Sequence, residues 1–204
     1  MKILNLYAGI GGNRKLWNEV KDDIEVTAVE LNPEIAKIYL DFFPNDKMIV
    51  GDAHEYLLNH FKEYDFIWSS PPCPTHSDIR RCGVHRGRFK AVYPDMNLYQ
   101  EIILLKHFSR SLFVVENVRS YYDPLIKPTK LERHYFWSNF NIKQAKGFMV
   151  KDVALAAMSN NSIIFDHNLQ NYEYKDKSKL LRNLVNPEVG KHIFNCAINN
   201  SELF

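Results

Sequence analysis

The chain contains no long hydrophobic run and little cysteine. Within its 204 residues, no stretch approaches the roughly 18 consecutive apolar residues of a membrane span, so we expect no membrane partner. Three cysteines, Cys73, Cys82 and Cys196, are too few and odd in number for a disulfide framework, which favours a reducing cytoplasm. No signal-peptide pattern precedes the first apolar run, and a net charge of +2 favours no class of partner.

Apolar and aromatic residues are plentiful, at 46% and 13% of the chain, and they support a single hydrophobic core. Short apolar runs predict strands over residues 3–7, 25–30, 47–50, 64–69, 112–115 and 135–140. Helical spacing predicts helices over 13–20, 33–43, 99–108 and 185–198 and from residue 54, with Asn32 as the cap of the second. The alternation predicts an α/β fold with a mainly parallel sheet flanked by helices.

Ligands of parallel sheets bind at the carboxyl ends of the strands. Five residues able to bind a ligand or react fall at such ends: Gly9, Glu30, Asp52, Cys73 and Glu116. Their shared position across five strands predicts one functional site at this edge of the sheet.

A glycine-rich turn, Gly9-Ile10-Gly11-Gly12, follows the first strand. Such a turn lets the backbone approach a ligand closely, with a helix N-terminus beyond it. Glu30, about twenty residues further on, can bind ribose hydroxyls, and Asp52 can accept from an adenine amino group. Tight packing would explain the glycines without a ligand, and solvation would explain either carboxylate alone.

Cys73 lies in a proline-stiffened loop after a buried strand, which favours a presented nucleophile over a small packed side chain. A free thiol of pKa about 8.5 needs activation, and a helix N-terminus or a nearby arginine can supply it. Glu116 directly follows Phe113-Val114-Val115, and this apolar setting predicts a raised pKa and proton donation near pH 7. The alternative is that Glu116 is the structural partner of an arginine.

Two further patterns follow Cys73. Cys73, His76, Cys82 and His85 form a CxxH…CxxH arrangement that resembles a zinc ligand set, but the short gap and the loss of the nucleophile favour no metal. The segment from Arg80 to Lys90 holds five Lys/Arg residues and no acidic residue, which favours a mobile loop closing on a polyanion over a solvated charged face.

Taken in order, these blocks resemble the DNA cytosine-5 methyltransferases. LNLYAGIGG, VELNP and GDAHEY are similar to the three motifs that bind S-adenosylmethionine, SSPPCPTHS to the catalytic Pro-Cys motif, and VVENV to the Glu-Asn-Val motif. RHYFWSNF is similar to the block that supplies arginines near the base, and NLVNPEV to the last motif, which returns to the cofactor. The resemblance covers about residues 1–140 and 181–198, and the ordered set of motifs is specific.

The resemblance implies a Rossmann-like, S-adenosylmethionine-dependent methyltransferase that flips a cytosine out of duplex DNA and methylates C5 through a covalent cysteine adduct. It assigns catalysis to Cys73, Glu116 and Arg133. It assigns cofactor binding to Tyr7, Ala8, Gly9, Ile10, Gly11, Gly12, Glu30, Leu31, Asp52, Ala53, Pro71, Asn183 and Val185. Ser77 is at the family's phosphate-contacting serine, and with the basic segment it gives the DNA-binding set Ser77, Arg80, Arg81, Arg86, Arg88 and Lys90.

The chain departs from the family pattern in three places. Pro74 replaces the usual glutamine after the catalytic cysteine, and the arginine block offers only Arg133 and His134. Only about 40 residues lie between Phe140 and Leu181, where the family has a large target-recognition region. We therefore expect a catalytic domain over 1–140, a reduced recognition segment over 141–180 and a returning C-terminal helix over 181–204, with a protein partner as a source of specificity. Cytosine in tRNA, a pyrimidine nucleotide, and a non-catalytic nucleic-acid-binding subunit are the alternatives.

Overall fold

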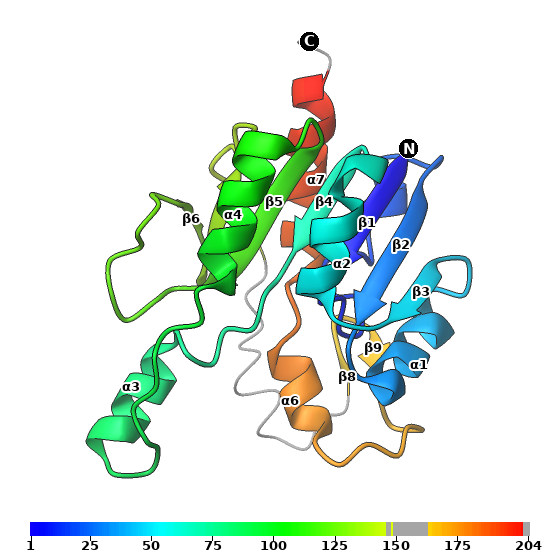
Figure 1. Cartoon of the computed structure of the whole chain (residues 1–204). Helices are drawn as coiled ribbons and strands as arrows, with labels where there is room; N and C mark the ends of the chain where they lie inside the picture. Colours follow the sequence, from blue (N-terminus) through cyan, green and yellow to red (C-terminus); the bar gives the residue numbers. More distant parts are fainter. Residues whose placement is uncertain (146–147, 149–162, 202–204) are drawn as a thin grey trace.

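The structure, a computed structural model, describes residues 1–145, 148 and 163–201. Seven strands form one sheet in the order β3-β2-β1-β4-β5-β7-β6 (Figure 1). They are β1 Lys2–Leu6, β2 Glu25–Glu30, β3 Lys47–Val50, β4 Phe66–Ser69, β5 Leu112–Val118, β6 Thr129–Leu131 and β7 His134–Ser138. The first five are parallel, whereas β7 is antiparallel to both β5 and β6. The predicted α/β class with a mainly parallel sheet is confirmed.

The strand order reverses between β1 and β4. From β1 the chain moves outward to β2 and β3, then returns to place β4 on the other side of β1. In sheets of this kind the crevice for a ligand opens at such a reversal, outside the carboxyl ends of the strands. The glycine turn follows β1 and the Cys73 loop follows β4, so the topology brings both to this point.

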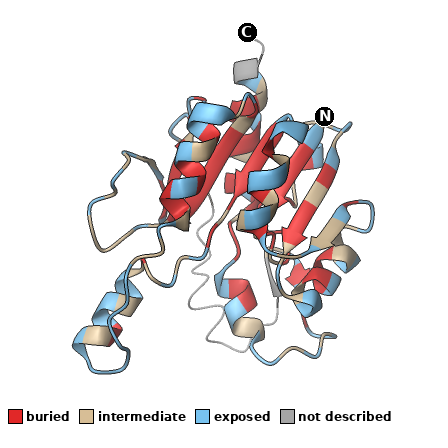
Figure 2. Cartoon of the chain, viewed as in Figure 1, coloured by how far each residue is buried: buried red, intermediate tan, exposed pale blue. Residues whose placement is uncertain are grey.

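Helices cover both faces of the sheet, and the buried strands lie between them (Figures 1 and 2). Helix α2 (Ala53–His60) and α4 (Asn97–Phe108) pack on one face through Leu57, Ile102 and Leu105. Helix α7 (Pro187–Ser201) and Trp17, in the short 3₁₀ helix η1 (Trp17–Glu19), pack on the other. The remaining helices in the described residues are α1 (Pro33–Phe42), η2 (Phe61–Glu63), α3 (Asp78–His85) and α6 (Lys177–Arg182). Strands β8 (Ile163–Ile164) and β9 (His167–Asn168) pair with each other in a separate two-stranded ribbon.

The α-helix expected over residues 13–20 is absent. The segment consists of turns and η1, with successive i→i−3 hydrogen bonds such as Arg14 N to Gly11 O and Trp17 N to Arg14 O. An α-helix would need i→i−4 bonds, which the packing disfavours, because a Cβ at Gly190 of α7 would lie 2.3 Å from the Asn13 carbonyl oxygen. The glycine turn therefore has no regular helix N-terminus beyond it.

Two other expectations need correction. Strand β5 runs to Val118, so Glu116 lies inside the strand, opposite Phe136 of β7, and does not follow it. The basic segment after Cys73 is not an irregular loop, since it contains α3, capped by Ser77 Oγ on the amide of Arg80. Position 83 of that helix is occupied by glycine, because a Cβ there would lie 2.2 Å from the Phe89 ring.

The expected closing helix is confirmed as α7, and the cap on α1 is confirmed because Asn32 Oδ1 accepts from the amides of Glu34 and Ile35. Of the reduced recognition segment 141–180, residues 146, 147 and 149–162 lie outside the described residues. The described remainder holds the β8–β9 ribbon and the start of α6, and Leu169 packs there against Ile10 of the glycine turn. Within the described part of the chain, no helix is long and apolar enough to cross a membrane.

Candidate active site

The Cys73 loop is attached to the strand that carries Glu116. After β4 ends, the side chain of Ser70 hydrogen-bonds to Glu116, and Asn117 Nδ2 donates to the Pro71 carbonyl at 2.9 Å. These contacts hold the start of the loop against β5. They bring Cys73 close enough to Glu116 for the two charges to interact.

Glu116 is a buried carboxyl group whose pKa is near 7. Burial raises its pKa to about 7, and the Ser70 hydrogen bond and the Arg133 charge oppose that rise. His134 Nε2 lies 3.5 Å from Glu116 Oε1, across the β5–β7 pair. Burial and the charges of Arg133 and Arg119 lower the pKa of His134 to about 3, so this imidazole is neutral. The raised pKa expected for Glu116 is confirmed.

The Cys73 thiol is not activated in this structure. Burial and the neighbouring Glu116 charge raise its pKa to about 11, and Arg133 and Lys179 offset only part of that rise. The suggested nearby arginine is present, since Arg133 lowers the pKa of Cys73, but burial and the Glu116 charge outweigh its effect. Arg133 acts electrostatically on both groups, and its guanidinium also donates to the carbonyl of Arg182 at the end of α6.

The glycine turn leaves room for a ligand at one position. Gly9 has φ 55°, and a Cβ there would meet nothing within 4 Å. Its amide donates to Glu30 Oε2, and the amide of Asn32 donates to Glu30 Oε1, both at 3.0 Å. Each carboxylate oxygen retains a further acceptor site, so Glu30 can shape the turn and still receive a hydroxyl donor. Leu31 beside it is exposed.

Asp52 has a clear structural use. One of its oxygens accepts from the amide of Glu55 at 3.0 Å and caps α2, while the residue itself is exposed. Ala53 is buried in the first turn of that helix. A carboxylate in this position can cap the helix and still accept from a ligand.

The last sequence motif returns to the glycine turn, as expected. A Cβ at Gly12 would lie 2.6 Å from the carbonyl oxygen of Val185, which shows how closely the two backbones approach. Val185 is buried, whereas Asn183 is exposed at the C-terminal cap of α6. Tyr7, Ala8, Ile10 and Gly11 form the rest of the turn, and a Cβ at Gly11 would lie 2.2 Å from the Phe43 ring.

A buried carboxylate that the sequence analysis missed lies under the turn. Glu101 of α4 has no exposed surface and accepts from Tyr7 Oη at 2.6 Å and from Ser69 Oγ at 2.5 Å. His54 Nδ1 lies 3.0 Å away, and its hydrogen bond to Glu101 raises the pKa of His54. Tyr7 and Ser69 directly flank the strand reversal, so Glu101 joins the two strand ends. The glutamate in the apolar helix pattern was the only signal in the sequence.

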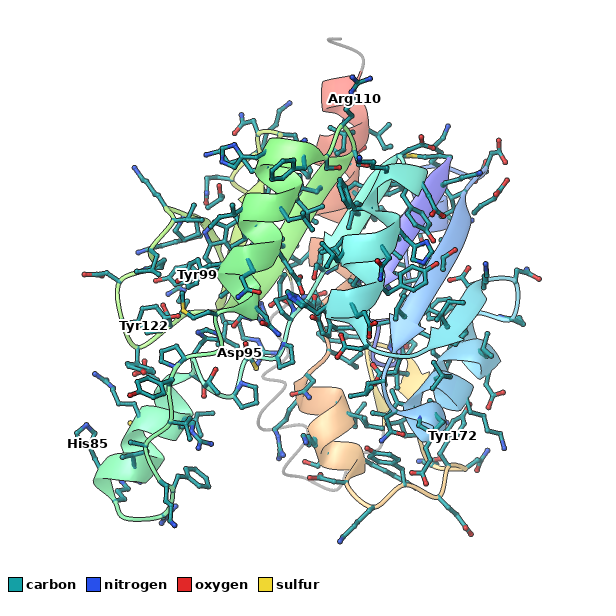
Figure 3. All side chains as sticks on the ribbon, viewed as in Figure 1. His85, Asp95, Tyr99, Arg110, Tyr122 and Tyr172 are labelled. Carbon is teal, nitrogen blue, oxygen red and sulfur yellow. The ribbon has the colours of Figure 1, made fainter. Side chains whose placement is uncertain are left out.

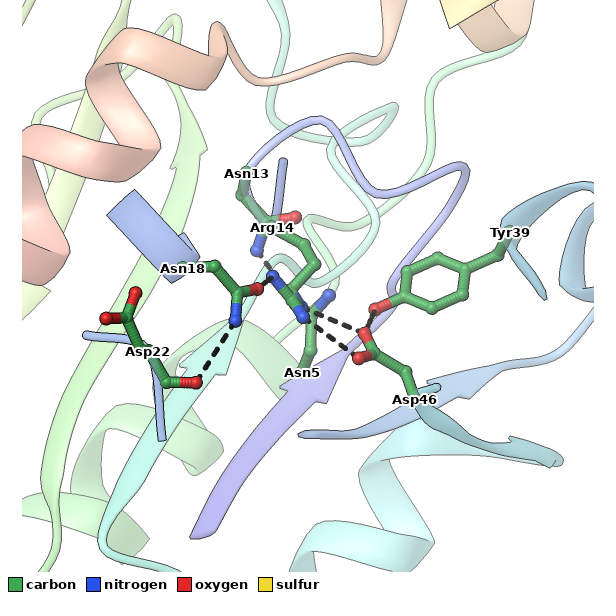
Figure 4. A network of polar contacts seen from close by, with 7 residues as sticks. All are labelled: Asn5, Asn13, Arg14, Asn18, Asp22, Tyr39 and Asp46. Carbon is green, nitrogen blue, oxygen red and sulfur yellow. Dashed lines mark hydrogen bonds and ion pairs between the residues drawn. The ribbon is translucent and has the colours of Figure 1, made fainter. Parts of the chain in front are cut away.

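A second missed network fixes the far side of the turn (Figure 4). Arg14 Nε and Nη2 each donate to Asp46 at 2.9 Å, and Tyr39 Oη donates to the same carboxylate at 2.8 Å. Asn13 Nδ2 donates to Asn5 Oδ1 at 2.8 Å in the interior of the sheet. This bidentate ion pair is buried, and it anchors the turn to the loop before β3.

The predicted DNA-binding residues lie away from the body of the molecule. Arg80 and Arg81 are on α3, Arg86 caps its C-terminus, and Arg88 and Lys90 lie on the returning segment. Figure 3 places His85 at the outer end of α3, far from the sheet. Among the described residues no group of three or more His, Cys, Asp or Glu could hold a metal ion, so the four cysteine and histidine candidates do not converge.

The comparison with protein families decides the assignment. The model for C-5 cytosine-specific DNA methylase matches residues 1–133, which include the glycine turn, Cys73, Glu116 and Arg133. The chain belongs to the C-5 cytosine-specific DNA methylase family. Membership in this family implies chemistry that depends on S-adenosylmethionine.

The known proteins that resemble this methylase chain match different shares of its length. A tRNA (cytosine(38)-C(5))-methyltransferase of Spodoptera frugiperda is 36% identical over 75 residues, which are 35% of this chain and 23% of that protein. The match therefore spans less than a quarter of the length of that curated relative. The methyltransferase EhMeth of Entamoeba histolytica has the same fold, with a TM-score of 0.60 and 12% identity over 98% of both chains. A Spodoptera frugiperda DNMT2 variant is 26% identical, over 57% of this chain and 35% of that one, with a TM-score of 0.40.

Proposed function

We propose that the chain methylates C5 of cytosine in DNA, with S-adenosylmethionine as the methyl donor. The observation that carries the proposal is the attachment of the Cys73 loop to β5, which gathers a thiol, a carboxyl group of pKa about 7 and an arginine beside that strand. Family membership supplies the reaction class. The proposed catalytic residues are Cys73, Glu116 and Arg133.

The cofactor site proposed is the turn from Tyr7 to Gly12 with Glu30, Leu31, Asp52, Ala53, Pro71, Asn183 and Val185. The open space over Gly9 and the unused acceptor sites of Glu30 fit a ligand with a ribose. S-adenosylmethionine would supply an electrophilic methyl group there when bound. The protein contributes the position of the turn and the exclusion of water by the returning Val185 segment.

The chemistry assigned to the side chains balances around the cytosine ring. Glu116, about half ionised near pH 7, accepts the thiol proton of Cys73 and donates a proton to ring N3. The Cys73 sulfur adds to C6, and the resulting enamine makes C5 a nucleophile that takes the methyl group. Water then accepts the C5 proton, the N3 proton returns to Glu116, and departure of the Cys73 thiolate restores the aromatic ring. In a duplex the base must first be flipped out of the stack.

The direct test is covalent trapping. A duplex that carries 5-fluorocytosine should form a stable adduct with the wild-type chain, because fluorine does not leave as a proton does, and intact-mass analysis shows the crosslink. Cys73→Ser should give no adduct, while Cys82→Ser, which changes an exposed cysteine on α3, should react like the wild type. An adduct with Cys73→Ser would place the nucleophile elsewhere.

Cytosine in RNA is the second candidate substrate, and the tRNA-modifying relative from Spodoptera frugiperda favours it. Radiolabelled S-adenosylmethionine offered with duplex DNA, tRNA or dCMP separates the substrate classes. Transfer to DNA supports the proposal. Transfer to tRNA alone would replace DNA by RNA, and no transfer with retained nucleic-acid binding would favour a non-catalytic subunit.

A further inference from the structure

A hollow lies along the arm that carries α3 and reaches the body at Thr75 and Tyr121. The arm, residues 77–94, leaves the body after the Cys73 loop and returns before α4, and most of its residues are exposed (Figure 2). Three contacts close its base: the amide of Asp95 donates to Thr75 Oγ1 at 2.9 Å, His76 Nδ1 lies 2.6 Å from Tyr122 Oη, and Ser77 forms a bridge with Ser120. Figure 3 shows Asp95 and Tyr122 where the arm meets the body. The arm is therefore anchored in a fixed position.

The cavity between the arm and the body has about 120 Å³. A closed cavity of about 150 Å³ holds a benzene ring, so this smaller, open-sided cavity can take one edge of a planar ring while the rest of the ring lies at its opening. Val84, Val92 and Tyr121 supply apolar and aromatic walls, and Arg80, Arg81 and His85 supply cationic or donor groups at the same opening. Thr75, which also lines it, is two residues from Cys73.

The charge and exposure of the arm favour a nucleic acid over another planar ligand. Asp78 is the only acidic residue on the arm, and it pairs with Nη2 of Arg81 at 2.8 Å, so the other arm charges stay positive and the remaining guanidinium donors of Arg81 can still contact a phosphate. Arg80 Nε is buried without a hydrogen-bond partner among the described residues. Four of the eleven large hydrophobic residues that are exposed in the described part lie on the arm: Ile79, Phe89, Val92 and Tyr93.

We propose that this cavity is a subsite for one unpaired nucleotide that neighbours the target cytosine, with the base between Tyr121 and Val92 and its phosphate at Arg80 and Arg81. The proposal rests on the proposed function, because the target cytosine defines which nucleotide is the neighbour. A base can enter the cavity only when it is unstacked, and aromatic stacking together with arginine contacts is how proteins hold unpaired nucleotides. The subsite therefore selects a locally unpaired strand, which either a DNA loop or an RNA loop can provide.

The test measures binding, not methyl transfer. Fluorescence anisotropy compares a hairpin that has an unpaired cytosine-containing loop with a fully paired duplex of the same composition, in separate DNA and RNA arms. Val92→Trp should fill the cavity from a position that is 47% exposed and lower hairpin affinity about tenfold, the equivalent of about 1.4 kcal/mol, with duplex affinity unchanged. Tyr93→Trp, at a neighbour that is 94% exposed and does not line the cavity, should change neither affinity.

A charge pair keeps the test decisive if Val92→Trp misfolds. Arg81→Gln and Arg86→Gln each remove one positive charge from the arm, but only Arg81 lines the cavity. Arg81→Gln should weaken hairpin binding more than duplex binding, whereas Arg86→Gln should weaken both alike. Equal losses for both probes in the cavity variants, no loss, or no binding of the hairpin by the wild type would overturn the subsite.

The outcomes separate this subsite from the proposed function. Methylation of duplex DNA with no effect of Val92→Trp on hairpin binding removes the subsite and leaves the function. Selective loss of hairpin binding in a chain that transfers no methyl group retains the subsite and removes the function. The DNA and RNA arms show which backbone the cavity accepts.

Discussion

At the scale of single residues, the pKa of Glu116 makes folding sensitive to pH. Its folded-state pKa of about 7 lies above the ordinary 4.5, so its contribution to stability is fully present below about pH 4.5 and is lost as pH rises through 7. A shift of about 2.5 units corresponds to about 3 kcal/mol. Glu116→Gln should therefore gain up to about 3 kcal/mol in free energy of unfolding over the wild type between pH 4.5 and 8, measured by urea denaturation. Glu25→Gln, at an exposed position at the start of β2, is the control, and a constant difference between Glu116→Gln and the wild type at all pH values would contradict the assignment.

The sequence predicted Glu116 better than Cys73 for a physical reason. A raised pKa needs only burial, and the apolar residues before Glu116 already show that its strand is buried. Activation of a thiol depends instead on which charges lie near it in space. After burial, the Glu116 charge has the largest influence on the pKa of Cys73, and nothing in the local sequence around Cys73 specifies that neighbour. The contact of His134 with Glu116 was missed for the same reason, because it arises only through the pairing of β5 with β7.

At the scale of structural elements, the Arg14–Asp46 pair holds the glycine turn in place of the expected helix. Removing one partner leaves a buried charge without compensation, which costs about 3–5 kcal/mol. Asp46→Asn should therefore lower the free energy of unfolding by an amount in that range, measured by denaturant titration. Asp22→Asn, a change of the same kind at an exposed position, should have almost no effect. A loss below about 1 kcal/mol in Asp46→Asn would show that the pair contributes little.

The Glu101 network should connect α4 to cofactor binding. Glu101→Gln places an amide donor against the donors from Tyr7 and Ser69, so one buried group loses its partner at a cost of about 1–3 kcal/mol. We expect weaker binding of S-adenosylmethionine by calorimetry, because Tyr7 begins the cofactor turn with φ 55°. Glu63→Gln, at an exposed carboxylate paired with His60, is the matched control. Lower thermal stability with unchanged cofactor affinity would restrict the network to a role in folding.

Elements with an apolar period were predicted well, whereas those fixed by single polar contacts were not. Strands β1 to β4 and helices α1 and α4 follow from buried runs that pack into the hydrophobic clusters of the molecule. The segment over 13–20 shows helical spacing in the sequence, yet it forms turns and η1, where the Asn13 backbone lies against Gly190 of α7 and Arg14 pairs with Asp46. In α3, Gly83 and Gly87 suggested a loop, but Gly83 admits the Phe89 ring and Gly87, at φ 68°, follows the end of the helix. The capping serine before Asp78 was the signal that favoured a helix there.

At the scale of the whole molecule, the domain boundaries and the source of specificity remain predictions. Only about 40 residues separate Phe140 from Leu181. Because a bidentate base contact contributes only about 1–3 kcal/mol of discrimination, a segment of this size should read few bases unaided, and we propose that a protein partner extends the recognised sequence. Bisulfite sequencing of plasmid DNA treated with the purified chain should show methylation at many short sites. Strict methylation of a site of about six base pairs or more would contradict this expectation.

The positive charges of the arm should determine how strongly DNA binding depends on salt. If recognition contributes little, much of the affinity for DNA should come from phosphate contacts by the arm, with Ser77, Arg80, Arg81, Arg86, Arg88 and Lys90 as the proposed contacts. Each neutralised phosphate contributes about one unit to the slope of log affinity against log salt concentration. Arg86→Gln with Arg88→Gln should therefore flatten that slope by about two units. Lys106→Gln with Arg110→Gln removes the same charge at the opposite end of the molecule, where Figure 3 places Arg110, and should leave the slope unchanged. If both double variants flatten the slope equally, DNA affinity depends on net charge alone, and the arm is not the DNA-binding surface.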